Sequence, residues 1–397
     1  MSKKIFIIAG EASGDLLGSK LIRELKIQDS NLEFIGVGGK LMQEEGLKTI
    51  FPMEELSVMG ILEVLPHIPK LLKLINYTAK KITEEKPQII ITIDSPDFNF
   101  RVMKKLQKNH EIKKVHLIAP SVWAYREGRA KKISKLYDLL LAILPFEPPY
   151  FEKYGLKTVF IGHPIVEKVP DFSKKEQLNL EFRKKYQIQN DEILVCVTPG
   201  SRNSEVKKIF PEFIGAINLI KGSDPFSSKR GLTPLGGVPV RVVIPLVAKT
   251  KNLVEKLAKN LQVKYFFIED KEKESAFFAS NFALAKSGTN TVELSLYQIP
   301  MIVAYKINFI THFIIKLIVK IKFANLINLI SNQQIIPEML QDNCCKEKLA
   351  KLLEKLILDK NFALKQIEDS KFALNLMGLQ SLEKSSAKAA KEILNDK

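Results

Sequence analysis

The stretch IAGEASGD, residues 8–15, follows a short apolar run and opens a helical pattern of leucines. A strand, a turn of small residues and a helix N-terminus together bind anions, because free backbone N–H groups and the helix dipole favour negative charge there. A second stretch of this kind, TPGSRNSE at residues 198–205, follows the apolar run 193–197. These two anion cradles, one in each half of the chain, predict two α/β domains that face each other across a cleft.

Strand and helix patterns alternate in both halves, which is typical of doubly wound α/β domains. Continuously apolar runs in the first half indicate strands that are buried on both faces of a parallel sheet. We expect strands at 4–9, 33–37, 88–93, 115–119, 138–143, 158–161, 192–198, 240–246, 263–268, 281–286 and 300–304. We expect helices at 14–27, 68–85, 97–109, 127–136, 147–154, 203–221, 250–260, 272–279, 289–297 and beyond 345.

The GHP string at residues 162–164 marks the expected hinge between the two domains. The first domain is expected at 1–165, completed by C-terminal helices at about 378–397, and the second at 166–377. Residues 222–239 are rich in proline and glycine, which predicts a disordered insertion on the surface.

The 397 residues carry 61 basic and 44 acidic side chains, a net charge of +17. Such an excess indicates an anionic partner, which could be nucleic acid, a phospholipid surface or a phosphorylated substrate, although a lysine-rich genome gives the same composition. The excess is mostly lysine spread over helix faces, without arginine-rich blocks interleaved with aromatics, and this argues against nucleic acid. Three cysteines cannot form a disulfide framework, and the apolar run 5–8 is too short for a signal peptide, so we expect a cytoplasmic location.

An apolar helix expected at residues 309–330 carries one narrow polar stripe. Lysines at that interval disfavour a bilayer span and favour the membrane interface, where they lie near lipid phosphates; a buried helix of the second domain is the alternative. The expected membrane contacts are Phe309, Phe313, Ile314, Lys316, Leu317, Ile318 and Lys320. The protein is therefore expected at the surface of an anionic membrane.

Two carboxylates, Asp94 and Asp97, follow an expected strand in the string IDSPDFN, where catalytic groups of an open α/β sheet belong. A metal pair is a weak interpretation because no His or Cys lies close by, so no metal is expected. One carboxylate could be a general base and the other a helix cap, or both could be caps. The string PSVWAYR at residues 120–126 follows the next strand and suggests either a substrate-recognition loop or simple packing.

The string KSGTNTVE at residues 286–293 forms a third strand–turn–helix pattern. Its small residues offer hydroxyl and N–H groups to a phosphate, Glu293 could accept hydrogen bonds from ribose hydroxyls, and Arg202 offers a cationic fork to a diphosphate. Together with residues 198–205, this pattern favours a nucleoside diphosphate ligand. Neither loop matches the P-loop signature.

These strings together resemble the lipid-A-disaccharide synthases, a family of GT-B glycosyltransferases with two Rossmann-like domains. The resemblance covers nearly the whole chain and rests on AGEASGD (9–15), GVGG (36–39), DSPDFN (94–99), PSVWAYR (120–126), PFE (145–147), GHP (162–164), PGSR with Glu205, KSGTNTVE (286–293), PMIVAYK (300–306), Asn325-Leu326 and PEMLQ (337–341). The sequence departs from the family at Phe323-Ala324, where Leu-Pro is usual, and in the insertion.

The resemblance implies transfer of a sugar from UDP-2,3-diacylglucosamine to the 6-hydroxyl of 2,3-diacylglucosamine 1-phosphate, with inversion at the anomeric carbon and without a cofactor. It assigns the base to Asp97, with Glu11 as the other candidate. The donor side would comprise Gly200, Ser201, Arg202, Glu205, Lys286, Ser287, Gly288, Thr289, Glu293, Asn325, Glu338 and Gln341. The acceptor side would comprise Gly10, Ser13, Gly14, Asp15, Asp94, Ser121, Trp123 and Arg126.

The partners implied are the two lipid substrates and an anionic membrane surface, with a homodimer possible and no nucleic acid. A UDP-N-acetylglucosamine 2-epimerase on the same fold is the enzymatic alternative, but it acts on a soluble sugar and needs no lipid surface. A basic protein that binds nucleic acid or anionic lipid without catalysis is the other alternative, and it predicts a steep salt dependence of binding.

Overall fold

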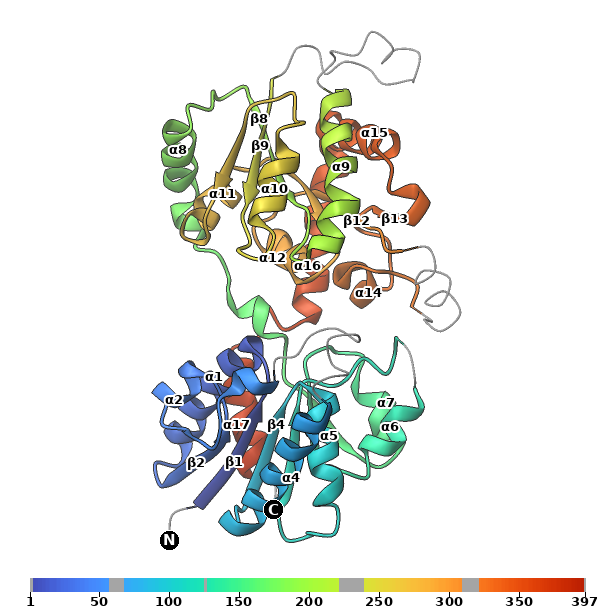
Figure 1. Ribbon diagram of the computed structural model, residues 1–397. Helices are drawn as coiled ribbons and strands as arrows, with labels where there is room; N and C mark the ends of the chain where they lie inside the picture. Colours follow the sequence, from blue (N-terminus) through green and yellow to red (C-terminus); the bar gives the residue numbers. More distant parts are fainter. Residues whose placement is uncertain (1–2, 57–67, 125–126, 221–238, 309–320, 396–397) are drawn as a thin grey trace. The chain divides into compact units, whose positions relative to one another are not determined.

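The computed structural model describes residues 3–56, 68–124, 127–220, 239–308 and 321–395. The chain forms two compact units, one made of residues 1–167 and 380–397 and the other of residues 168–379. Each unit contains one parallel β-sheet with helices on both faces (Figure 1). The expected doubly wound α/β fold is confirmed in both units.

Unit 1 is built on a seven-stranded sheet in the order β3-β2-β1-β4-β5-β6-β7. Its elements are β1 (Lys3–Ala9), α1 (Ala12–Gln28), β2 (Leu32–Val37), α2 (Lys40–Glu44), β3 (Lys48–Thr49), α4 (Ile68–Glu85), β4 (Ile89–Ile93), α5 (Pro96–Lys105), β5 (Lys113–Leu117), α6 (Gly128–Ile133), β6 (Leu139–Ala142), α7 (Pro148–Glu152), β7 (Lys157–Phe160) and α17 (Ser385–Asn395).

Both faces of the unit 1 sheet are apolar because alternate residues of each strand point to opposite sides. Phe6 and Ile8 of β1 belong to the core under α4 and α5, whereas Ile5 and Ile7 belong to the core under α1 and α17. The C-terminal helix α17 packs against α1, so the last residues of the chain complete the unit formed by the first (Figure 1).

Unit 2 is built on a six-stranded sheet in the order β10-β9-β8-β11-β12-β13. Its elements are α8 (Lys175–Lys185), β8 (Ile193–Thr198), α9 (Asn203–Ile220), β9 (Val240–Pro245), α10 (Lys251–Ala258), β10 (Tyr265–Ile268), α11 (Lys273–Ala279), β11 (Phe282–Lys286), α12 (Thr289–Leu296), β12 (Met301–Tyr305), α14 (Leu326–Ser331), β13 (Glu338–Leu340), α15 (Lys346–Leu358) and α16 (Lys360–Leu376). One core lies where α9 packs against α10 and α15.

The strand order reverses once in each sheet, between β1 and β4 in unit 1 and between β8 and β11 in unit 2. Open parallel sheets bind ligands at such a switch point, outside the carboxyl ends of the strands. The loops that follow these four strands are the motif loops 10–15, 94–99, 199–205 and 287–293, so topology alone places them at the two positions where ligands are expected.

One expected element was wrong. The helix expected at 309–330 does not extend through residues 321–325, which have no helical structure, and α14 begins only at Leu326. Asn325 ends the irregular segment by capping α14: its Oδ1 accepts a hydrogen bond from the backbone N–H of Ile327 at 2.7 Å. The expected membrane contacts between 309 and 320 and most of the insertion at 222–239 lie outside the described residues.

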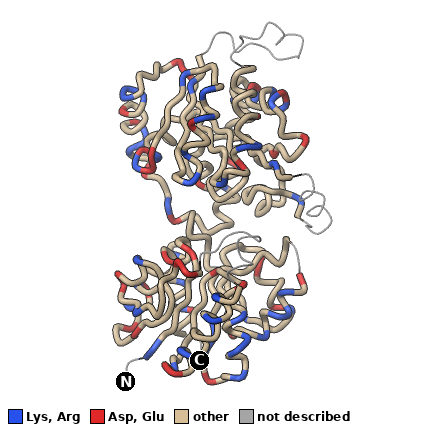
Figure 2. The backbone as a smooth tube through the Cα atoms, viewed as in Figure 1, with Lys and Arg blue, Asp and Glu red and all other residues tan. Residues whose placement is uncertain are grey.

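Lys and Arg residues are spread along the chain in both units and are interspersed with Asp and Glu (Figure 2). Many of them form surface ion pairs, such as those of Lys185 with Glu272 and Lys306 with Glu212. No helix within the described residues is long and apolar enough to cross a bilayer.

Candidate active site

The switch point of unit 1 brings the turn after β1 into contact with the turn after β4. A Cβ atom added to Gly10 would lie 2.4 Å from Ser95 Oγ and 3.0 Å from Ser95 Cβ, so a larger residue would push the Ser95 side chain aside. Glycine at position 10 thus allows the close approach of these two turns.

The backbone around this switch point is strained. Asp94 and Ser95 have φ values of +47° and +43°, and Ile118, at the end of the neighbouring strand β5, has φ of +77°. Left-handed conformations of non-glycine residues cost about 1–3 kcal/mol each and cluster at functional sites. The buried Asn99 side chain holds the Asp94 turn, because its Nδ2 donates to the Asp94 carbonyl at 2.7 Å.

Asp97 lies in the first turn of α5 with 94% of its side chain exposed, and Arg129 Nη2 is 3.6 Å from its Oδ1. The N-cap residue of α5 is Ser95, so neither Asp94 nor Asp97 is the N-cap. Asp94 is half-buried, and this burial raises the pKa of its carboxyl group. The two carboxylates therefore differ in environment, although only three residues separate them in the sequence.

A pocket of about 280 Å³ opens beside these residues at the carboxyl ends of β4 and β5. It is lined by Asp94, Pro96, Ile118, Ala119, Pro120, Ser121, Val122 and Arg129. Two expected acceptor-side residues, Asp94 and Ser121, thus lie in the wall of one pocket. Arg126 lies outside the described residues.

Other expected acceptor-side residues support the fold. Asp15 is buried, and its carboxylate accepts hydrogen bonds from the backbone N–H groups of Leu41 and Met42 at 3.1 and 3.0 Å. It therefore stabilises the start of α2. Gly14 is buried against β1, whereas Ser13 is exposed, and Glu11 occupies the N-cap position of α1 without a side-chain capping bond.

Trp123 is tied to a buried carboxyl group. Its indole Nε1 donates to Glu147 Oε1 at 3.2 Å, and the backbone N–H of Leu144 donates to Glu147 Oε2 at 3.1 Å. Burial raises the pKa of Glu147 to about 7, although these hydrogen bonds oppose the shift. The Trp123 ring also packs edge-on against Phe146. The hydrogen bond to Glu147 and the ring contact with Phe146 thus fix Trp123, and with it the loop after β5.

In unit 2, the turn after β8 is organised by Glu205. Its Oε2 accepts hydrogen bonds from the backbone N–H groups of Ser201 and Arg202 at 3.2 and 3.3 Å, which is a capping-box arrangement at the start of α9. Gly200 has a φ of +126°, a backbone conformation that glycine adopts readily and other residues rarely adopt. Glu205 therefore occupies part of the anion cradle with its own carboxylate.

The turn after β11 is joined to this cradle by two contacts. Lys286 Nζ lies 3.0 Å from Glu205 Oε1, and Asn290 Nδ2 donates to Thr198 Oγ1 at 2.6 Å. Arg202 is 73% exposed and only 3.8 Å from Glu205 Oε1, so its guanidinium group can turn to a ligand. The two loops thus meet at the Glu205 carboxylate, whose Oε1 lies near both Lys286 and Arg202.

Three of the remaining donor-side residues are held by other residues of unit 2. Ser287 Oγ donates to the Ala324 carbonyl at 2.7 Å, and Glu293 Oε2 accepts from Lys273 Nζ at 2.7 Å. Gly288 and Thr289 begin α12, with Gly288 in the N-cap position. Gln341 Oε1 accepts a long hydrogen bond, 3.3 Å, from the backbone of Ile307.

Glu338 shapes the loop before α14. Its two oxygens accept hydrogen bonds from the backbone of Ala324 at 2.8 Å and of Asn325 at 2.9 Å, and Oε1 also accepts from Asn328 Nδ2 at 2.8 Å. Asn325 Nδ2 is buried and has no hydrogen-bond partner among the described residues. Glu338 thus affects the expected donor site indirectly, because it fixes the backbone of the loop that precedes α14.

Sequence reasoning missed several residues of these networks. Asn99 and Glu147 belong to quoted strings, DSPDFN and PFE, but nothing in those strings indicates that Asn99 binds the Asp94 carbonyl or that Glu147 binds Leu144 and Trp123. Arg129, Asn328 and Lys273 stand in helices without a distinctive pattern, and only the fold brings them to the site. Among the described residues, no group of three or more His, Cys, Asp or Glu side chains could hold a metal ion.

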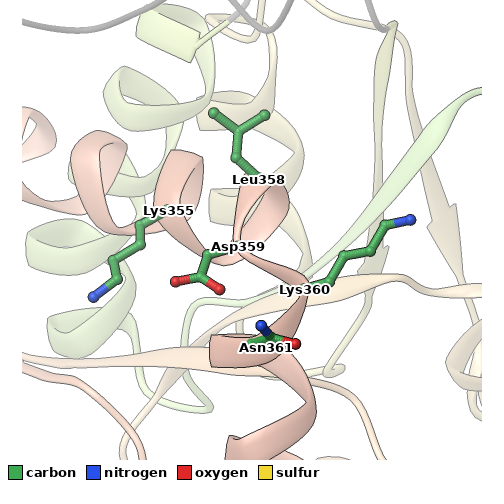
Figure 3. Close-up of a pocket in the computed structure, with 5 residues that line it drawn as sticks. All are labelled: Lys355, Leu358, Asp359, Lys360 and Asn361. Atoms are coloured by element: carbon green, nitrogen blue, oxygen red, sulfur yellow. The ribbon is translucent and has the colours of Figure 1, made fainter.

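A larger depression in unit 2, of about 550 Å³, lies at the junction of α15 and α16 and is lined by Lys355, Leu358, Asp359, Lys360 and Asn361 (Figure 3). Asp359 caps α16, since its Oδ1 accepts a hydrogen bond from the backbone N–H of Phe362 at 2.9 Å. The depression lies at the turn between two helices, and none of its lining residues belongs to a site motif.

The fold and the comparison structures define the class of protein. S. aureus MnaA, in a co-structure with UDP, aligns with a TM-score of 0.62 and 16% identity, over 99% of this chain and 97% of that chain. A glycosyltransferase from Rickettsia africae ESF-5 aligns with a TM-score of 0.55 and 15% identity, over 100% of this chain and 99% of that chain. Two doubly wound units in this arrangement of strands are the GT-B fold, which glycosyltransferases share with UDP-GlcNAc 2-epimerases.

Sequence comparison identifies the family. The model of the lipid-A-disaccharide synthetase family matches residues 5–393. Lipid-A-disaccharide synthase of Rickettsia bellii OSU 85-389 is 43% identical over 382 residues, 96% of this chain and 95% of that protein. The corresponding protein of Rhodospirillum centenum is 37% identical over 394 residues, 98% of this chain and 94% of that protein. The chain belongs to the lipid-A-disaccharide synthetase family, and it is a glycosyltransferase.

Proposed function

We propose that the protein transfers 2,3-diacylglucosamine from its UDP derivative to the 6-hydroxyl of 2,3-diacylglucosamine 1-phosphate. The products are a β-1,6-linked disaccharide 1-phosphate and UDP. The observation that carries this proposal is the exposed carboxylate of Asp97 beside a pocket at the unit 1 switch point, in a chain of this family. The acceptor is assigned to unit 1 and the donor to unit 2.

In this mechanism Asp97 removes the proton of the acceptor 6-hydroxyl while its oxygen attacks the anomeric carbon of the donor. The bond from that carbon to the UDP oxygen breaks, and UDP leaves with the electron pair. One displacement by one base inverts the anomeric configuration. General-base assistance of this kind contributes roughly 10²–10⁴-fold to the rate. Glu11 remains the second candidate for the base.

The leaving group needs charge stabilisation because the diphosphate gains negative charge as the bond breaks. Arg202 supplies an exposed cationic fork, and Lys286 lies beside it with its ammonium group on Glu205. In this proposal Glu293 of α12 accepts hydrogen bonds from the ribose, and its contact with Lys273 supports the role by fixing its carboxylate. We assign Gly200, Ser201, Ser287, Gly288, Thr289, Asn325 and Gln341 to the walls of the same donor site.

The acceptor and donor both carry acyl chains, so we propose that the protein works at the cytoplasmic face of an anionic membrane. The apolar sequence from 309 to 320 supplies the contact in this proposal. Replacing Ile314, Leu317 and Ile318 by Ser should move the protein from a membrane pellet to the supernatant without lowering its melting temperature. A variant that stays in the pellet would refute the contact.

The stereochemical outcome tests the mechanism. Proton NMR of the disaccharide made by the purified protein should show a β linkage, because the α-linked UDP sugar is inverted once. An α linkage would require two displacements and would remove Asp97 from the role of sole base.

A further inference from the structure

The pocket at the carboxyl ends of β4 and β5 contains one cation among its described lining residues, Arg129 from α6. The other titratable group in its wall is Asp94. Asp94 and Ile118, two residues with positive φ, both line this pocket. No motif of the sequence pointed to Arg129, and neither the donor site nor the base requires it.

Arg129 is held in place but remains able to bind a ligand. Its Cζ lies 6.0 Å from the centre of the Phe100 ring, within the range of a cation–π contact, and 28% of its side chain is exposed. Its contact with Asp97 is a single one at 3.6 Å to a carboxylate that is almost fully exposed. Such an open pair contributes little to stability, so the guanidinium group can exchange its partner for an anion that it binds with two hydrogen bonds.

We propose that Arg129 binds the phosphate group of the acceptor in this pocket and thereby releases Asp97 to act as the base. This inference rests on the proposed function for the identity of the acceptor. The ligand chemistry that the pocket recognises is a phosphate monoester on the anomeric carbon of a sugar.

The chemistry of the acceptor explains why the cation and the base are neighbours. In a hexopyranose the anomeric carbon and the carbon that bears the CH₂OH group are both bonded to the ring oxygen. The 1-phosphate and the 6-hydroxyl therefore lie on the same edge of the sugar. A phosphate held by Arg129 brings the 6-hydroxyl toward Asp97, its neighbour in the structure.

Asp94 is the acidic residue among the described residues that line this pocket. Burial raises the pKa of its carboxyl group, so this carboxylate takes up a proton more readily than an exposed one beside a bound phosphate. Ser121, which also lines the pocket, offers a hydroxyl group.

A binding cycle tests the inference. The ligands are short-chain 2,3-diacylglucosamine with and without its 1-phosphate, and binding is measured by calorimetry on the wild type, Arg129→Ala and Lys131→Ala. Lys131 is the matched control because it loses one charge from the same helix but does not line the pocket. Hydrogen bonds to charged groups contribute enough to predict that the wild type and Lys131→Ala bind the phosphorylated ligand about 10- to 100-fold more tightly.

Arg129→Ala should bind the two ligands within about threefold of each other, since the group that distinguishes them is gone. Arg129→Lys should fall between the alanine variant and the wild type, because it keeps the charge and loses the fork. Equal melting temperatures of the variants would show that folding does not cause the change. Full discrimination by Arg129→Ala, or none by the wild type, would overturn the inference.

Inorganic phosphate is the third ligand of the experiment. If it binds as tightly as the phosphorylated glycolipid, the pocket is a site for free phosphate and the inference fails. The result does not depend on turnover, so it is separate from the proposed function. A protein that distinguishes the ligands through Arg129 but releases no UDP would keep this inference and refute the proposed function.

Discussion

Lys286 Nζ lies 3.0 Å from Glu205 Oε1, and this ion pair joins the turn after β11 to the first turn of α9. The other oxygen of Glu205 accepts hydrogen bonds from the backbone of Ser201 and Arg202. One buried carboxylate thus holds together two loops that lie more than 80 residues apart in the sequence. The geometry of the donor loops depends on it.

Replacing Glu205 by Ala should destabilise unit 2, because the capping box and the ion pair are both lost. Loss of a helix cap costs about 1 kcal/mol, which lowers the melting temperature of a unit of this size by roughly 2–4 °C. Glu205→Gln should cost less, since an amide oxygen still caps the helix. Calorimetry should show no change for Lys207→Ala, an exposed residue of the same helix. Equal melting of the Ala variant and this control would contradict the role of Glu205.

Replacing Asp97 by Asn should abolish most of the turnover while UDP binding is retained. The expected loss is roughly 10²–10⁴-fold, the usual contribution of a general base. The side chain is almost fully exposed, so stability should not change. Steady-state kinetics and UDP titration measure the two effects, with Asp191→Asn as an exposed control. Turnover near the wild-type value would move the role of base to Glu11.

Replacing Arg202 by Ala should weaken UDP binding by about tenfold, because one charge-assisted contact to the diphosphate is lost. The ion pair of Arg202 with Glu205 spans 3.8 Å and the Arg202 side chain is 73% exposed, so it contributes little to stability. Fluorescence or calorimetric titration with UDP gives the dissociation constant. An unchanged constant would remove Arg202 from the donor site.

The fluorescence of Trp123 should report the ionisation of Glu147. Trp123 is the only tryptophan in the sequence, and its indole N–H donates to a carboxyl group whose pKa is raised by burial to about 7. Emission should therefore titrate with a midpoint near that value. Glu147→Gln should abolish the titration, whereas Glu152→Gln, an exposed change at the end of α7, the helix that follows Glu147, should keep it. A titration that survives in Glu147→Gln would assign it to another group.

The same group predicts the direction of a pH effect on stability. The pKa of Glu147 is raised from 4.5 to about 7 on folding, so the folded state holds the proton more tightly than the unfolded state. Stability should then fall as the pH rises through this window, by at most about 3 kcal/mol. Denaturant titrations at about pH 5 and about pH 8 should show a smaller fall for Glu147→Gln than for the wild type.

The positions of the loops could be predicted from the sequence, and most of their internal contacts could not. Apolar runs followed by small-residue turns indicated the strands and the helix starts, and a doubly wound fold places such turns at the switch points. The partners of Glu205, Glu338 and Asp15 could not be predicted, because each carboxylate can bind either a ligand or a nearby backbone N–H group. Only the folded geometry distinguishes these two uses.

The expected helix at 309–330 shows another limit of sequence patterns. Its polar residues have helical spacing. Asn325, however, belongs to a residue type that favours the N-cap position, and α14 begins directly after it. Arg129 is a residue that sequence patterns did not single out, because nothing in its own helix indicates a binding role. It lies near Asp97 because β4 and β5, the strands that precede their helices, are neighbours in the sheet.

The measurement that tests the central claim most directly is UDP release from UDP-2,3-diacylglucosamine in detergent, with and without 2,3-diacylglucosamine 1-phosphate and with and without EDTA. We predict release that requires the acceptor and does not change with EDTA, together with a disaccharide of the expected mass. Release without the acceptor, or no release at all, would contradict the glycosyl transfer proposed here and favour the epimerase or hydrolase alternatives.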